Sequence, residues 1–153
     1  YEPYLSVTIT KKVVGDMGDT TKNFSFTATL DTTQIRQGSA YTTAGDGAAL
    51  TDTGFTLRSG GSVTLTHLRA DQTLTLTETD PGDHTVSWQL NGDDGPTGVT
   101  CTLQVPRAQP AEITCINTRN VGIPTGLHTG AAPYLALVGL CWLGWRLLRR
   151  REV

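Results

Sequence analysis

The 153-residue chain carries 12 Lys and Arg against 14 Asp and Glu, a net charge of −2. Residues 1–122 are acidic and the end of the chain is basic, and the acidic part has no basic stripe, which excludes nucleic acid as a partner. No nucleophile elbow, phosphate loop, dinucleotide fingerprint or metal-ligand spacing occurs, so we expect no turnover enzyme, no cofactor and no metal. The chain opens at Tyr1 without Met or a signal peptide, which is typical of a fragment or a processed chain.

Residues 1–119 predict an all-β domain. Apolar side chains alternate with polar ones in seven or eight short segments separated by Gly, Asp and Pro turns, a pattern typical of an immunoglobulin-like β-sandwich. The segments are 5–13, 24–30, 55–57, 63–65, 74–78, 86–88, 99–105 and 113–117. The Ser-Gly-Gly-Ser turn at 59–62 predicts a hairpin, and residues 31–53 are expected to form a long loop or insertion.

Three polar residues fall on the apolar side of this alternation. Lys11, Glu78 and Asn117 occupy inward positions on the first strand, a middle strand and the last strand. Because an unpaired buried charge is costly, we expect these side chains to contact one another. A bulge in the first strand would turn Lys12 inward instead of Lys11. The alternative without special chemistry is an ordinary ion pair of Lys11 with Glu78, with Asn117 capping a loop.

Cys101 and Cys115 are equally far from residue 108 along the sequence, within an apparent hairpin. That hairpin would place them opposite each other on the inward face. This arrangement predicts either a disulfide or two buried thiols. Cys141 lies in a later apolar stretch and is interpreted as a small hydrophobe.

The C-terminal part predicts a membrane anchor. We expect a linker at 120–130, a transmembrane helix at 131–148 and a basic tail at 149–153. The arginines of the tail place it in the cytoplasm and the domain outside the membrane. The alternative is a buried core helix.

The linker contains Ile123, Pro124, Thr125 and Gly126, followed by the apolar stretch and the arginines. This order resembles the cell-wall sorting signal of Gram-positive surface proteins, in the shortened (I/V)PTG form rather than LPxTG. The resemblance implies that a sortase cleaves after Thr125 and joins the chain to a pilin lysine or to peptidoglycan.

The body also resembles the intramolecular isopeptide domains (Cna B-type) of Gram-positive pilins. The likeness rests on LSVTITKKVVGDMGD, on FTLRSGGSVTLTHL followed by LTLTET, and on ITCINTR, where the family usually has F-T-N-T-K. It implies that the Lys11 amine joins the Asn117 side chain with loss of ammonia, while Glu78 handles the protons.

Together these features predict a pilus subunit or stalk domain on the surface of a Gram-positive bacterium, with sortase and other pilin subunits as partners. The alternative from another class is a wall-anchored adhesin that binds a host or polysaccharide ligand through loops such as 31–53. A third interpretation is a membrane-tethered ectodomain that no sortase cleaves.

Overall fold

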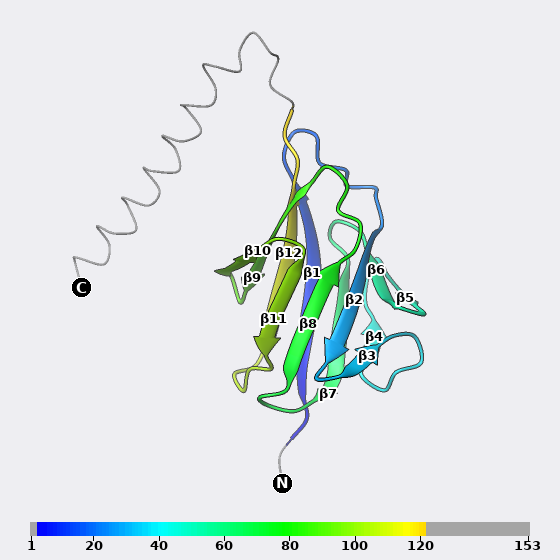
Figure 1. Cartoon of the computed structure of the whole chain (residues 1–153), viewed down its shortest axis with the longest axis vertical. Helices are drawn as coiled ribbons and strands as arrows, with labels where there is room; N and C mark the ends of the chain where they lie inside the picture. The colour runs from blue at the N-terminus through cyan, green and yellow to red at the C-terminus, as the bar shows by residue number, and fades with distance from the viewer. Residues whose placement is uncertain (1–2, 122–153) are drawn as a thin grey trace, which may run out of the picture. The chain divides into compact units, whose positions relative to one another are not determined.

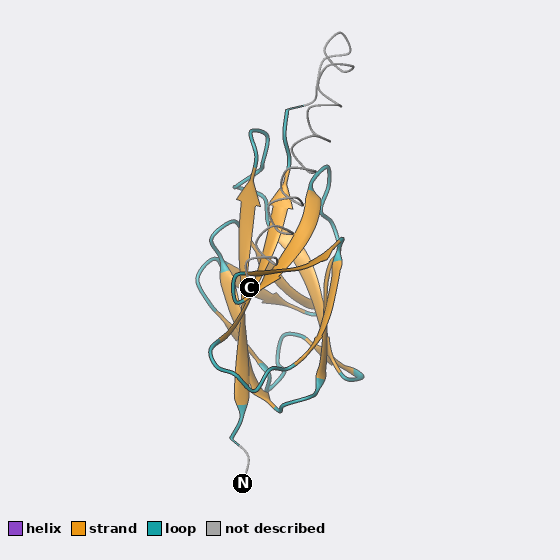
Figure 2. Ribbon diagram, turned by 90° about the vertical axis from the view of Figure 1, so that its left-hand side faces the viewer, coloured by secondary structure: helices purple, strands orange, loops and turns teal. Residues whose placement is uncertain are grey.

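Residues 3–121 are described by the computed structural model, and they form two packed β-sheets joined by loops at both ends (Figures 1 and 2). The predicted all-β sandwich is therefore confirmed. No helix within residues 3–121 is long and apolar enough to cross a membrane. The predicted transmembrane helix at 131–148, the basic tail and the Ile123–Gly126 motif lie outside the described residues.

Twelve strands make up the sandwich, more than the seven or eight predicted. They are β1 (Leu5–Val14), β2 (Phe24–Leu30), β3 (Thr33–Ile35), β4 (Thr42–Ala44), β5 (Ala48–Thr51), β6 (Gly54–Leu57), β7 (Ser62–Leu68), β8 (Thr73–Glu78), β9 (Thr85–Leu90), β10 (Asp93–Thr97), β11 (Thr100–Gln104) and β12 (Ala111–Thr118). The first sheet has the order β10-β9-β12-β1-β7-β4. The second has the order β11-β8-β2-β6-β5, and β3 pairs with β2.

The first and last long strands, β1 and β12, are neighbours at the centre of the first sheet. They run parallel, in a register that pairs Val7 with Ala111 and continues to Val14 and Thr118. Because they are parallel, β1 begins at one end of the sandwich and β12 ends at the opposite end (Figure 1).

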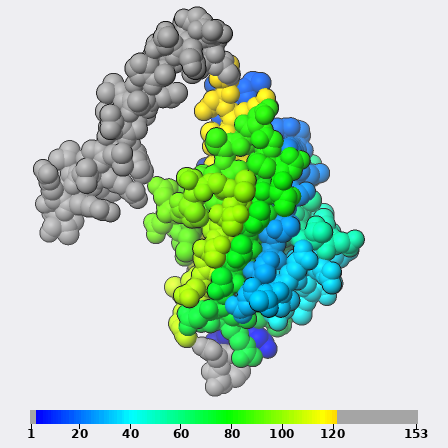
Figure 3. All heavy atoms as spheres, viewed as in Figure 1, coloured from blue at the N-terminus to red at the C-terminus, as the bar shows by residue number. Residues whose placement is uncertain are grey.

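The core lies between the sheets and follows the alternation of the sequence. Phe26 and Phe55 stack with their ring centroids 5.2 Å apart, and Trp88 meets Phe26 edge-on at 6.3 Å. Such aromatic pairs add roughly 0.5–1.5 kcal/mol each to the free energy gained from burial. Outside, the side chains of β2, β8 and β11 form a continuous surface over the second sheet (Figure 3).

The predicted hairpin at 59–62 is wrong. Strand β6 pairs with β2 and β5 in the second sheet, whereas β7 pairs with β1 and β4 in the first. The Gly-rich turn therefore carries the chain from one sheet to the other, with Gly60 at φ +86° and the Gly61 N–H donating to Arg58 O. A turn signal is local, and it does not specify whether the next strand joins the same sheet or the facing one.

The prediction of a long loop at 31–53 is also wrong. This segment contains β3, β4 and β5, which extend both sheets. The three strands are only three or four residues long, too short to show a clear alternation of polar and apolar residues.

The apparent hairpin between the two cysteines also carries the chain from one sheet to the other. Strand β11, with Cys101, belongs to the second sheet, and β12, with Cys115, belongs to the first. Both cysteines are buried, and in the structure both are free thiols rather than a disulfide.

Candidate crosslinking site

Lys11 points into the sandwich from the middle of β1, and its side chain is fully buried. Lys12 is exposed, so the alternation of the strand holds and no bulge exchanges the two lysines. The sheet-crossing turn holds the backbone here, because Lys11 N–H donates to Gly61 O at 2.9 Å and Gly60 N–H donates to Lys11 O at 2.8 Å.

Asn117 reaches the same interior from β12. The parallel register places Cys115 beside Lys11 and Asn117 beside Val13, two positions further along. Side chains at alternate positions share a face, so Asn117 lies ahead of Lys11 in the direction in which both strands run. Asn117 is fully buried.

Glu78 comes from the facing sheet, at the end of β8. Its backbone N–H donates to Val99 O at 2.9 Å, which ties this strand end to the segment before β11. The side chain is fully buried. The sandwich thus brings together three polar residues separated by 67 and 39 positions in the sequence, as the alternation predicted.

The Glu78 carboxylate bridges the other two residues. Lys11 Nζ donates to Oε1 at 2.7 Å, and Asn117 Nδ2 donates to Oε2 at 2.8 Å. Each carboxylate oxygen therefore contacts one of the two groups that the sequence analysis assigns as reactants. Because Asn117 contacts Glu78, the site differs from the alternative of an ordinary Lys11–Glu78 ion pair with Asn117 capping a loop elsewhere.

The walls of the site are aromatic. Lys11 Nζ lies 4.4 Å from the ring centroid of Phe24 and 5.6 Å from that of Phe26. The rings attract the ammonium group electrostatically and exclude water from it. An ion pair in such surroundings gains little net free energy, because removing both charges from water costs several kcal/mol per ion.

Cys115 completes the cluster, and the sequence analysis did not assign it there. Its Sγ lies 3.5 Å from Lys11 Nζ, 3.7 Å from Asn117 Oδ1 and 4.0 Å from Glu78 Oε1. Burial raises the pKa of the Cys115 thiol to about 12, although the Lys11 ammonium opposes the shift. The shared inward alternation of Cys115 and Asn117 was the signal that could have found it.

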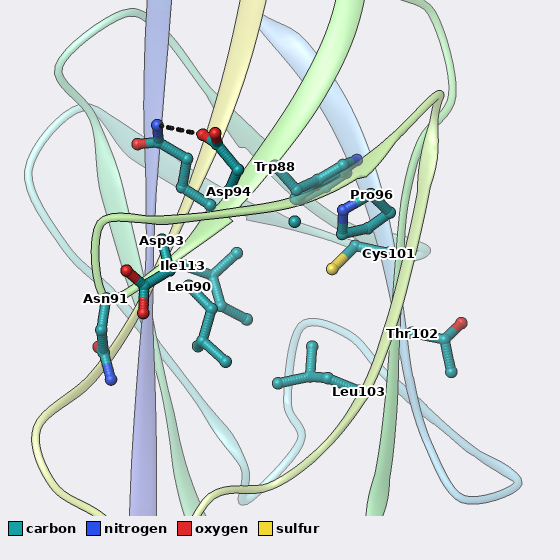
Figure 4. A pocket seen from close by; sticks show the side chains of 12 residues that line it. Trp88, Leu90, Asn91, Asp93, Asp94, Pro96, Cys101, Thr102, Leu103 and Ile113 are labelled. Carbon is teal, nitrogen blue, oxygen red and sulfur yellow. Dashed lines mark hydrogen bonds between the residues drawn. The ribbon is translucent and has the colours of Figure 1, made fainter. Parts of the chain in front are cut away.

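A separate pocket of about 300 Å³ opens between the β9–β10 hairpin and β11. Figure 4 shows Trp88, Leu90 and Ile113 on one side and Cys101 and Leu103 on the other. The Gln89 amide donates to Asp94 Oδ1 at 3.4 Å at its acidic edge. Within residues 3–121, no three His, Cys, Asp or Glu side chains gather in a way that could hold a metal ion.

Comparison with known proteins supports the β-sandwich fold. A pilin of Streptococcus pyogenes serotype M1 is 28% identical, over 86% of this chain and 44% of the pilin. The major pilin structure from Streptococcus pyogenes superposes with a TM-score of 0.53 at 23% identity, covering 76% of this chain and 48% of that one. A Mobiluncus mulieris adhesin described as containing intramolecular disulfide, isopeptide and ester bond crosslinks has a TM-score of 0.54 at 16% identity, over 76% and 41%.

These likenesses show that residues 3–121 form a β-sandwich domain similar to those of streptococcal pilins. Residues 5–119 match the family described as a domain of unknown function, DUF7601, and the chain belongs to that family. The chain spans less than half the length of the curated pilin that it matches.

Proposed function

We propose that this domain forms an internal isopeptide bond between Lys11 and Asn117 and serves as a pilus subunit or stalk domain on a Gram-positive cell surface. The observation that supports the crosslink is the Glu78 carboxylate, which hydrogen-bonds both reactants inside the buried core. Folding holds the groups together, and well-oriented groups reach effective molarities of roughly 10⁵–10⁸ M.

The reaction begins with proton transfer along the 2.7 Å contact from Lys11 Nζ to Glu78 Oε1, which leaves a neutral amine and a carboxylic acid. The amine attacks Asn117 Cγ, forming the new C–N bond and placing negative charge on Oδ1. Glu78 protonates Nδ2 across the 2.8 Å contact and takes a second proton from the lysine nitrogen, which keeps its third as the amide N–H. The Cγ–Nδ2 bond breaks, and ammonia leaves.

The reaction removes the free-energy cost of the buried Lys11–Glu78 ion pair, because its products carry no charge. An amide, a protonated Glu78 and free ammonia are all neutral, so no charge stays in the core. The bond joins parallel neighbours, β1 and β12, at the ends of the domain's chain. A pull applied to the two termini of the domain then passes through the covalent bond, and the residues between Lys11 and Asn117 carry no load.

Peptide mapping tests the crosslink. Digestion of the folded, reduced chain is expected to yield one branched peptide that contains both Lys11 and Asn117, and tandem mass spectrometry locates the branch. Lys12→Ala is the matched control, because Lys12 is exposed on the same strand, and it should leave the branched peptide unchanged. Separate linear peptides from the parent chain would contradict the proposal.

Sortase attachment at Ile123–Gly126 is the second part of the proposed function, supported by the motif and by the likeness to pilins. Incubation of the full chain with a pilin-type sortase should give cleavage after Thr125 and covalent multimers, and Thr125→Val should abolish both. Cleavage without multimers would favour the adhesin alternative. The pocket beside β11 is the observation that favours that alternative, since it offers an apolar surface with an acidic edge to a ligand.

A further inference from the structure

Cys115 occupies a position that an apolar residue would fill in an ordinary sandwich core. It lies at the centre of the β1–β12 pair, fully buried, with its register partner being Lys11. Its sulfur is within hydrogen-bond distance of Lys11 Nζ, the attacking nitrogen, and of Asn117 Oδ1, the oxygen of the carbonyl group whose carbon is attacked. An inference from this placement rests on the proposed crosslinking reaction and deepens it.

The reaction places its largest new charge on Asn117 Oδ1. When Lys11 attacks Cγ, that oxygen changes from a carbonyl to an oxyanion, and a donor aimed at it lowers the barrier. In the structure both Glu78 oxygens are directed elsewhere, one to Lys11 Nζ and the other to Asn117 Nδ2. The side-chain donor that the described residues place on Oδ1 is the Cys115 thiol, at 3.7 Å.

We propose that Cys115 is a catalytic residue of isopeptide formation, whose S–H donates a hydrogen bond to Asn117 Oδ1 and stabilises the oxyanion. The sulfur also accepts a hydrogen bond from Lys11 Nζ, which directs the nitrogen toward the carbonyl. A thiol is able to do both at once, because it carries one proton and weak acceptor lone pairs. Its proton stays on sulfur throughout, so the balance of the reaction is unchanged.

The surroundings favour a donor rather than a nucleophile. Burial raises the pKa of the Cys115 thiol to about 12, so the group keeps its proton at neutral pH. A thiolate would be the reactive form, and the core disfavours it. Glu78 Oε1 is a competing acceptor for the same proton, but it lies farther from the sulfur, at 4.0 Å.

The test compares Cys115→Ser, which keeps a donor, with Cys115→Val, which removes it and keeps an apolar side chain. Each full chain is recovered from inclusion bodies in denaturant, so that it is unfolded and has not yet reacted. It is then diluted into reducing buffer at neutral pH with detergent, which starts folding. Samples quenched in acid at successive times are weighed by intact-mass spectrometry to follow the loss of ammonia. Urea midpoints of the same two substitutions in a Glu78→Gln background report their effect on the unreacted fold.

Cys115→Val is expected to slow ammonia loss about tenfold, less than the roughly 10²–10³-fold typical of strong oxyanion donors, because a thiol is a weak donor. Cys115→Ser should react faster than Cys115→Val. In the unreacted background the order of stability should be the opposite, since an apolar core favours Val over Ser. A structural role alone would make the rates follow the stabilities.

The proposal is overturned if Cys115→Val reacts as fast as the parent chain, or if Cys115→Ser is as slow as Cys115→Val. A parent chain that folds and never loses ammonia would overturn the crosslink itself, and the role of Cys115 with it. The two failures are therefore distinguishable in one experiment.

Discussion

Replacing Asn117 by Ala removes the electrophile and leaves the Lys11–Glu78 ion pair in place. The proposed crosslink would close a loop of about 100 residues, for which the chain-entropy relation gives about 4.7 kcal/mol at 25 °C. For a domain of this size 1 kcal/mol corresponds to roughly 4 °C in Tm, so the variant should melt about 20 °C below the parent. Without the crosslink the unfolded chain gains conformational entropy, which favours unfolding. In the native state strands β1 and β12 keep their hydrogen bonds.

Differential scanning calorimetry of the reduced chains measures this difference. Lys12→Ala, on the exposed face of the same strand, is the matched control and should melt within about 2 °C of the parent, because surface substitutions change stability by less than ~0.5 kcal/mol. If Asn117→Ala melted within about 5 °C of the parent, the reasoning that a covalent bond closes the domain would be refuted.

Three further predictions concern individual side chains. Glu78→Gln should leave the full mass of the chain intact, and it should fold less stably than Asn117→Ala because Lys11 then lacks its counter-ion. The Cys115 thiol should resist iodoacetamide at pH 8 in the folded chain and react on unfolding. The pKa of this thiol rises from 9.0 in the unfolded chain to about 12 in the folded one. The free energy of unfolding should therefore not depend on this group below pH 9, and it should fall as the pH rises from 9 toward 12. Urea titrations of the parent and Cys115→Val would detect the difference. Hydrogen bonds from Thr21 lower the pKa of Asp19 from 3.8, so this group stabilises the fold above that pH and the effect is lost on acidification; NMR titration should find the pKa closer to 3.8 in Thr21→Val.

The sequence predicted the buried polar cluster better than it predicted the topology. Lys11, Glu78 and Asn117 were found because each lies on a long strand whose alternation defines the inward face. Burial of unpaired polar groups then required them to meet, whatever the order of the strands.

The sheet crossings could not be predicted by the same reasoning. The turns before β7 and before β12 have the composition of hairpins, yet each carries the chain between sheets. Which sheet a strand joins depends on long-range packing, and alternation within one strand contains no information about it. The position of Cys115 beside Lys11 was missed for this reason, since the apparent hairpin paired it with Cys101 instead.

The intact mass of the folded chain, measured after reduction and denaturation, reports directly whether Lys11 and Asn117 are joined. If the isopeptide bond forms, the mass should be lower than that of the sequence by one ammonia in the parent and in Lys12→Ala, and equal to that of the sequence in Glu78→Gln and Asn117→Ala. A parent chain with the full mass of its sequence would show that no bond forms and that Lys11, Glu78 and Asn117 are only a buried polar cluster.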